Sequence, residues 1–319
     1  MKAAILHDVN HPPRYDDYPD PAPVDGEVLV QVSSSALSHL ARNRASGKHY
    51  TSGTDLNFVP GVDGVGRLSD GRKVYFIFPT APYGAMGEIS RVKADQCIVI
   101  PDEVDDVILA AIAIPAMSSW AALTERAHMA AGETILINGA TGASGRLAIQ
   151  IAKHLGAKKV IATGRNETQL TNLSKLGADV MISLRQSKED LDLALRREFN
   201  EGIGIVLDYL WGKSAEQIIA VKVAKGSKSI SERCRFVQIG SLSGADITLP
   251  SAALRSSGLE LLGSGHGSLS TQGMLNAIQA VASVIVPRKL LVKAKAVPLS
   301  RVEATWNEDA EGSRVVYTI

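Results

Sequence analysis

Residues 133–166, ETILINGATGASGRLAIQIAKHLGAKKVIATGRN, decide the fold of this chain. Residues 134–138 predict a short strand, and glycines follow at positions 139, 142 and 145. Residues 147–155 then carry apolar side chains at helical spacing, and Gly156 can end that helix in the left-handed conformation. A second strand is predicted over residues 159–163. The order is therefore strand, tight glycine turn, helix and strand.

Such a unit is suited to hold a pyrophosphate. Glycine lets the backbone approach the phosphates, and the helix N-terminus offers unpaired N–H groups and a partial positive charge. The spacing is GxxGxxG rather than the commoner GxGxxG, and the alternative is a plain structural turn. Because the turn lies between a strand and a helix, we expect it to bind a dinucleotide through Gly139, Thr141, Gly142, Ala143, Ser144 and Gly145.

The second strand ends in Gly164, Arg165 and Asn166, which we expect to contact the adenosine end of the cofactor. An NAD site usually has Asp or Glu here, which bonds the ribose hydroxyls. An arginine can instead pair with the 2′-phosphate of NADP in a bidentate fork. Arg165 stands at the position of the acid, so NADPH is the predicted cofactor; the alternative is an exposed loop arginine.

Composition indicates an ordinary globular protein. A length of 319 residues predicts two domains, and the net charge of +1 favours neither nucleic acid nor membrane partners. The two cysteines, Cys97 and Cys234, form no CxxC pair, and no secretory leader is expected at the N-terminus, which favours the cytoplasm. Residues 107–124 carry no charge, but Pro115 and the serines after it favour a buried helix pair over a transmembrane segment.

The rest of the chain alternates between two characters. Residues 1–100 are β-rich and predict a compact, barrel-like domain, interrupted at residues 33–50 by a helix-like segment that we expect to line a substrate pocket. Helices are predicted over residues 104–114 and 119–129, followed by alternating strands and helices, which are typical of a parallel sheet. The β-branched tail, residues 291–297 and 314–319, is expected to return to the N-terminal β domain.

The chain resembles the medium-chain dehydrogenase/reductase superfamily, in its zinc-free, quinone oxidoreductase-like branch. The motifs that carry the resemblance are EVLVQV at 27–32, VPGVDGVGRL at 59–68, SSWAAL at 118–123, the glycine unit, LSKLGAD at 173–179, FVQIGS at 236–241 and GSRVVYTI at 312–319. It implies an α/β fold, with a Rossmann domain of doubly wound parallel sheet at 118–286 inserted in a GroES-like β-barrel catalytic domain at 1–117 and 287–319. It also implies a homodimer, for which residues 259–262 are a candidate edge strand.

The departures from the resemblance concern the metal. Zinc enzymes of the superfamily have a Cys-His pair where this chain has Ser38 and His39, and Gly-His-Glu where it has Gly61, Val62 and Asp63. A catalytic zinc needs about three protein ligands, which these positions do not supply. No metal is therefore predicted.

The residues that line the substrate pocket are also altered. The zinc-free branch commonly has Asn, Asp and Tyr in this segment, where an ungapped comparison places Ser38, Ala41 and His49, with Tyr50 one residue later. Candidates to bond a substrate carbonyl are Ser38, His39, Asn43, His49 and Tyr50, with Tyr50 preferred. The alternative is a packed or surface role for His39 and a loop position without function for His49 and Tyr50.

Three further cofactor contacts are implied by position in the resemblance. Ser118 stands where relatives have a threonine near the nicotinamide, although it is also a plausible N-cap of the helix that follows. Gly240 and Ser241 end the strand whose loop usually covers the nicotinamide half. A lysine that many relatives place after the 2′-phosphate arginine is Thr168 here.

The sequence therefore predicts an NADPH-dependent, zinc-independent reductase. A quinone or an α,β-unsaturated carbonyl is the favoured substrate, because the reduced quinone oxygen needs no strong general acid whereas a simple ketone or aldehyde needs a zinc ion or a positioned acid. Two alternatives remain open. One is an alcohol dehydrogenase-like enzyme, and the other is a weakly catalytic NADPH-binding protein that acts as a redox sensor or binds a partner.

Overall fold

The computed structural model describes residues 1–47, 56–226, 229–308 and 312–319. The chain divides into two compact units: unit 1 is Met1–Ile114 with Ile278–Ile319, and unit 2 is Pro115–Ala277. Unit 2 is thus inserted into the sequence of unit 1. These divisions lie within helices α2 (Asp106–Ala121) and α8 (Thr271–Arg288). The predicted domain boundaries after residues 117 and 286 remain a prediction.

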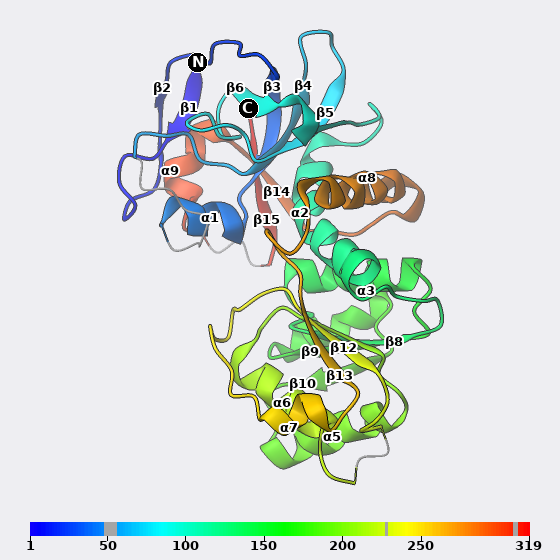
Figure 1. The fold of residues 1–319 in the computed structure, drawn as a ribbon. Coiled ribbons are helices and arrows are strands. Elements are labelled where there is room, and N and C mark those ends of the chain that lie inside the picture. Colours follow the sequence, from blue (N-terminus) through cyan, green and yellow to red (C-terminus); the bar gives the residue numbers. More distant parts are fainter. Residues whose placement is uncertain (48–55, 227–228, 309–311) are drawn as a thin grey trace. The chain divides into compact units, whose positions relative to one another are not determined.

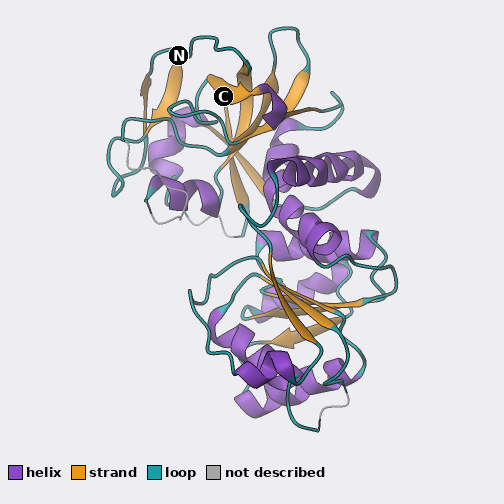
Figure 2. Cartoon of the chain, in the orientation of Figure 1, coloured by secondary structure: helices purple, strands orange, loops and turns teal. Residues whose placement is uncertain are grey.

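Unit 2 is built on a six-stranded sheet in which every neighbouring pair is parallel (Figures 1 and 2). The strand order is β10-β9-β8-β11-β12-β13, so the chain moves outward from β8 to β10 and then resumes on the other side of β8. The strands are β8 (Thr134–Asn138), β9 (Lys159–Gly164), β10 (Val180–Ser183), β11 (Ile205–Asp208), β12 (Cys234–Gln238) and β13 (Leu259–Gly263). The predicted doubly wound α/β fold is confirmed.

Helices cover both faces of this sheet. Helix α3 lies on one face, and α5, α6 and α7 lie on the other (Figure 1). The bounds are α3 (Ala143–His154), α4 (Glu167–Thr171), η3 (Asn172–Leu176), α5 (Lys188–Asn200), α6 (Gly212–Lys222) and α7 (Ser251–Arg255). Gly156, at φ +90°, follows the end of α3 as predicted. Because both faces are covered, the strands are almost continuously apolar.

The predicted helix pair around Pro115 is wrong, because one helix, α2, continues through the proline. The helix is followed by a π-helical turn, η2 (Ala122–Arg126). Two serines bond back to the preceding turn of the helix, since Ser118 Oγ donates to Pro115 O at 2.8 Å and Ser119 Oγ donates to Ala116 O at 2.9 Å. Ser118 is therefore an interior helix residue and not the N-cap that its sequence position allowed.

Helical residues Asp106–Arg126 are long and apolar enough to cross a membrane by length and composition, with a mean hydropathy of 1.8. Among the described residues, this is the one helical segment that meets both criteria. Of the 18-residue stretch that gives this mean hydropathy, 67% is buried inside the protein, as in a core helix.

Unit 1 contains a seven-stranded sheet in which the last strand of the chain pairs with an early one. Its path is β14-β15-β3-β4-β5-β7, with β6 paired to β3, and all pairs are antiparallel except β14 and β15. Val316 in β15 lies opposite Ala36 in β3, which agrees with the expected return of the tail. The strands are β3 (Glu27–Ala36), β4 (Asp63–Arg67), β5 (Lys73–Ile77), β6 (Ile89–Lys93), β7 (Cys97–Val99), β14 (Ala294–Pro298) and β15 (Arg314–Thr318).

A two-stranded ribbon and short helices complete unit 1. They are β1 (Lys2–Ile5), β2 (Arg14–Asp17), α1 (His39–Ala45), η1 (Ala94–Gln96), η4 (Leu299–Arg301) and α9 (Val302–Thr305). Apolar side chains of β1, α1, η4 and α9 share one buried cluster with Leu37, with Trp306 after α9 and with Tyr317 of β15. The sequence did not predict β2, β4 or β6, and β3 extends to Ala36 beyond the predicted break at Ser33.

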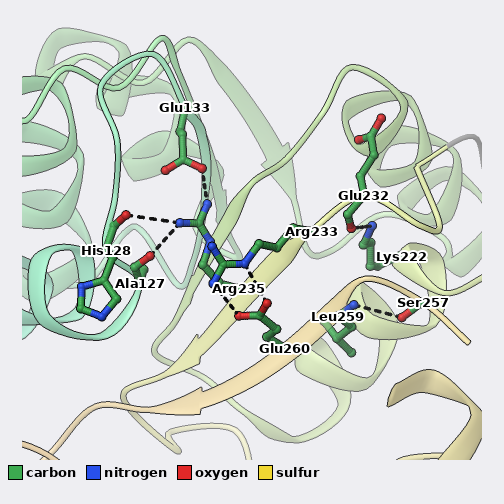
Figure 3. Close-up of polar contacts among 10 residues, drawn as sticks. All are labelled: Ala127, His128, Glu133, Lys222, Glu232, Arg233, Arg235, Ser257, Leu259 and Glu260. Atoms are coloured by element: carbon green, nitrogen blue, oxygen red, sulfur yellow. Dashed lines mark hydrogen bonds and ion pairs between the residues drawn. The ribbon is translucent and has the colours of Figure 1, made fainter. Parts of the chain in front are cut away.

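Side-chain bonds tie together the amino ends of strands in unit 2 (Figure 3). Arg235 in β12 is 5% exposed, and its guanidinium donates to Ala127 O at 2.7 Å and to the carboxylate of Glu133, which precedes β8. Arg233 forms an exposed fork with Glu260 of the edge strand β13, at 2.7 Å and 3.0 Å. One buried and one exposed arginine thus make similar pairs in different environments.

We expect Arg235→Ala to lower the free energy of unfolding by about 3 kcal/mol, because it removes one partner of a buried pair. Arg233→Ala is the matched control and should cost at most about 1 kcal/mol, because water screens the exposed pair. Urea unfolding of both variants measures the difference. Equal losses would show that burial does not set the strength of these pairs.

Candidate functional site

The glycine turn between β8 and α3 is shaped by two close contacts of the chain with itself. Gly139 has φ +87°, and a Cβ there would lie 2.8 Å from Leu210 Cγ. A Cβ on Gly145 would lie 2.5 Å from the Cα of Ala140, so only glycine lets α3 start this close to the turn. Both glycines are therefore required by the packing of the protein itself.

Gly142 differs from these two, because nothing in the chain requires it to be glycine. It is the N-cap of α3 with φ −72° and ψ 166°, which any residue adopts. A Cβ there would meet nothing closer than Gly139 O at 3.8 Å. The missing side chain leaves open space in front of the helix, as a ligand that approaches the backbone closely would need.

The N-terminus of α3 presents unpaired donors to that space. No side chain caps it, and no acidic residue lies in its first turn. The amides of Ala143, Ser144 and Gly145 have no intrahelical partner, as is normal for a first turn. Arg146 follows, and within the described residues its guanidinium makes no hydrogen bond or ion pair. The sequence pattern did not indicate Arg146 as a cofactor contact. The positive ends of the amide dipoles and the charge of Arg146 lie together here. An anion bound at this place would therefore be stabilised.

A buried hydrogen-bond network supports the turn from below. Asn138 Nδ2 donates to Asp208 Oδ1 at 2.8 Å, and Thr163 Oγ1 donates to Asn138 Oδ1 at 2.7 Å. Burial raises the pKa of Asp208, while the amides of Leu210 and Trp211 and the Asn138 side chain oppose that rise. The network joins the carboxyl ends of β8, β9 and β11, where the strand order reverses and ligands bind in such sheets. In the sequence, this network is marked by a polar residue at or next to the end of each of three apolar strands.

The end of β9 lies directly against the glycine turn. A Cβ on Gly164 would lie 2.5 Å from Thr141 Cγ2, so glycine is needed for this approach. Arg165 is exposed, and its guanidinium has no hydrogen bond or ion pair in the described part of the chain. Asn166 caps α4 by accepting from Gln169 N at 3.0 Å. The structure therefore brings the predicted adenosine contacts next to the predicted phosphate turn.

The predicted nicotinamide contacts lie at neighbouring strand ends and in α2. Gly240 follows β12 and donates its N–H to Asp208 O at 3.1 Å, while Ser241 is exposed. A cavity of about 350 Å³ is lined by Trp211, Gln238, Ala245, Leu261, Leu262 and Gly263, and Gln238 Nε2 donates to Gly240 O at 3.1 Å. Trp211 has φ 58°, a strained conformation for a non-glycine residue, which is enriched at functional sites.

The predicted catalytic residues are only partly described. His49 and Tyr50 lie outside the described residues. Ser38 is buried and caps α1, because its Oγ accepts from Ala41 N at 3.0 Å. Asn43 is exposed on the same helix. Partial burial, with Arg42 and Arg314 nearby, lowers the pKa of His39, so its imidazole is neutral at pH 7.

Asp63, which stands at the position of the glutamate in zinc enzymes, is fully buried in unit 1. Tyr75 donates to its Oδ2 at 2.7 Å. Burial raises the pKa of Asp63 to about 6, although the Tyr75 hydroxyl and Arg314 act in the opposite direction. Asp63 Oδ1 and two nitrogens of Arg314, Nε and Nη2, are buried without a hydrogen-bond partner among the described residues.

The thiols of Cys97, which is partly buried, and of Cys234, which is buried, have raised pKa values. Burial raises the pKa of Cys97 and of Cys234 to about 12, so neither forms a thiolate near neutral pH. Over residues 1–47, 56–226, 229–308 and 312–319, no three His, Cys, Asp or Glu side chains are grouped so that they could hold a metal ion.

Comparisons with known proteins identify relatives along the whole chain. A family model described as zinc-binding dehydrogenase matches residues 143–283. A probable NADPH-dependent quinone reductase, tdiC, of Emericella nidulans is 28% identical over 99% of this chain and 99% of its own. An NADPH-dependent alkenal/one oxidoreductase, chloroplastic, of Arabidopsis thaliana is 29% identical over 52% of this chain and 47% of its own.

Solved structures agree on the fold. The quinone oxidoreductase of Thermus thermophilus, solved also as a complex with NADPH, covers 100% of both chains with a TM-score of 0.81. Its sequence is 22% identical to this chain, so this likeness establishes the architecture alone.

Gly145→Ala should destabilise unit 2 by about 2 kcal/mol, because the new Cβ overlaps backbone atoms that cannot move freely. Gly142→Ala should cost less than about 1 kcal/mol, the difference between these residues as an N-cap. Denaturant unfolding of both variants tests this contrast. Equal destabilisation would contradict the view that Gly142 is free of packing constraints.

Replacement of Asp63 by asparagine should change the pH dependence of stability. The folded pKa of about 6 exceeds the ordinary value of 3.8, so the folded state binds more protons between these pH values. Wild-type stability relative to Asp63→Asn should therefore fall as the pH rises from well below 3.8 to above 6, by an amount on the order of 3 kcal/mol in all, and stay constant above pH 7. Urea unfolding across this range measures it; a constant difference would mean that the carboxyl is not perturbed.

Proposed function

Because the chain belongs to the medium-chain dehydrogenase/reductase superfamily, in its quinone oxidoreductase-like branch, we propose that it is a zinc-independent, NADPH-dependent reductase of quinones or α,β-unsaturated carbonyls. The observation that carries the proposal is the uncapped N-terminus of α3 behind the open space at Gly142. This geometry has no role in the packing of the protein and suits a bound pyrophosphate.

The residues of unit 2 fit NADPH. The amides of Ala143 and Ser144 and the guanidinium of Arg146 are placed for the pyrophosphate, and Arg165 for the 2′-phosphate. The bound cofactor supplies a hydride from its nicotinamide ring. The chain itself supplies orientation, because Asn138, Thr163 and Asp208 hold the turn and the strand ends in one arrangement.

Zinc independence is supported by the residues at the ligand positions of the zinc enzymes. Ser38 uses its hydroxyl to cap α1, and Val62 is a buried apolar residue. The family model described as zinc-binding matches residues 143–283, which contain neither position. The description of that family therefore does not bear on the metal in this chain.

The substrate class is argued from the candidate proton donors that lie among the described residues. Without zinc, reduction of a simple ketone needs a positioned proton donor, and the neutral His39 is a poor one. A quinone or an enone accepts hydride and can take its proton from water. The tdiC protein is named a quinone reductase and the Arabidopsis protein an alkenal/one oxidoreductase, which supports both substrate types.

We further propose a cytoplasmic homodimer with the cofactor domain at residues 118–286. Strand β13 is the terminal strand of the unit 2 sheet, so its outer edge is free to pair with a second copy. The two shielded thiols suit a reducing compartment.

NADPH consumption by purified, chelator-treated protein with a small quinone as acceptor tests the proposal. We expect turnover that is insensitive to the chelator. Gly142→Ala should fold yet bind NADPH about tenfold more weakly, because its methyl group occupies the path of the phosphates. Loss of turnover on chelation would overturn zinc independence. NADPH binding without turnover on quinones or enones would favour the redox-sensor alternative, and absence of NADPH binding would overturn the whole proposal.

A further inference from the structure

A second arginine, Arg185, follows the end of the strand that neighbours β9. Gly164 at the end of β9 is the Cα partner of Ser183 at the end of the parallel strand β10. The register continues one step further, because Leu184 N donates to Gly164 O at 2.9 Å. Arg165 and Arg185 therefore leave adjacent strand ends at the same edge of the sheet.

Local hydrogen bonds fix the backbone at both positions. Ser183 Oγ accepts from Arg185 N at 3.2 Å, and Gln186 Nε2 donates to Ser183 O at 2.8 Å, which closes a tight turn after β10. On the other side, Asn166 holds the start of α4 through Gln169 N. The two side chains thus extend from ordered turns.

Both guanidinium groups lack a counter-charge. Arg165 and Arg185 are exposed, and within the described residues neither makes an ion pair or a side-chain hydrogen bond. Glu167 and Glu189 are close to them in sequence but pair with neither. Arg235, by contrast, is paired with Glu133. Two like charges that follow neighbouring strand ends repel, and a bound dianion would relieve that repulsion.

The arginine pair adjoins the phosphate-binding turn. Gly164 precedes Arg165 and is packed against Thr141 of the glycine turn, where a Cβ would lie 2.5 Å from Thr141 Cγ2. A dinucleotide whose pyrophosphate meets the start of α3 would place its adenosine ribose next to this strand end. The 2′-position of that ribose is where NADP and NAD differ.

We propose that Arg185 acts together with Arg165 to bind the 2′-phosphate of NADPH, which makes Arg185 a specificity-determining residue. This inference rests on the proposed function. A phosphate dianion has three oxygens to satisfy, and two planar guanidinium forks from adjacent strands supply donors from two directions. The pair also compensates for the lysine that relatives carry at the position of Thr168. With NADH, the two positive charges stay unpaired, which disfavours that cofactor.

Binding of 2′,5′-ADP and of 5′-AMP, measured by calorimetry, isolates the 2′-phosphate from the rest of the cofactor. Wild-type protein should bind 2′,5′-ADP more tightly. Arg185→Gln should weaken 2′,5′-ADP binding roughly tenfold, the value of one charge-assisted contact, with 5′-AMP unchanged. Arg185→Lys should lose less than the glutamine variant, because it keeps the charge but not the fork. Arg165→Gln should behave like Arg185→Gln.

Arg197→Gln is the matched control. Arg197 is exposed near the carboxyl end of α5, where it makes a 3.8 Å ion pair with Glu201, whereas Arg185 precedes the start of that helix. The control should leave both affinities unchanged.

The possible outcomes distinguish a failure of the proposed function from a failure of the role of Arg185. Wild-type protein that binds neither nucleotide, nor NADPH, would overturn the proposed function. Wild-type protein that prefers 2′,5′-ADP, with Arg185→Gln no weaker than the Arg197→Gln control, would overturn the role of Arg185 alone. A parallel loss of 5′-AMP affinity in Arg185→Gln would equally contradict a contact to the 2′-phosphate.

Discussion

The hydrogen bonds among Asn138, Thr163 and Asp208 are the constraint on which the rest of unit 2 depends. They join three neighbouring strands at the point where the strand order reverses, and every group in the network is buried. A buried amide and carboxylate are costly unless they are paired, so the three strand ends are held in one register. That register sets where the glycine turn leaves the sheet and hence where the open N-terminus of α3 faces.

The cofactor side of the protein was predictable because its signals are local. These signals are the glycine spacing, the apolar stripe of a helix and a left-handed cap at Gly156, and each depends on residues close together in sequence. The structure confirms the predicted strands, the helix between them and the left-handed conformation of Gly156. Arg165 and Asn166 also lie where the strand pattern placed them. Arg185 was not predictable in the same way, because its proximity to Arg165 comes from the pairing of β9 with β10.

The errors occurred where tertiary packing overrides a local rule. Proline usually ends or kinks a helix, yet α2 continues through Pro115, where neighbouring helix residues such as Ala111 and Ala116 are fully buried by tertiary packing. Strands β4 and β6 were missed because glycines and alternating serine or arginine residues weaken their pattern, and pairing with β3 makes them strands. For the substrate pocket, sequence offered His49 and Tyr50, which lie outside the described residues, and a serine that proves to be a helix cap.

The pairing of β15 with β3 has a consequence for how the chain is made. Unit 2 is contiguous in sequence, so its sheet can be completed on the ribosome while residues 294–318 are still to be translated. The sheet of unit 1 cannot, because Val316, Tyr317 and Thr318 supply partners for β3. Until then the end of β3 that β15 covers, residues 34–36, lacks its strand partner, and unpaired strand edges favour aggregation. The nascent protein can therefore pass through a stage in which the sheet of unit 2 is complete while the sheet of unit 1 still lacks its last two strands.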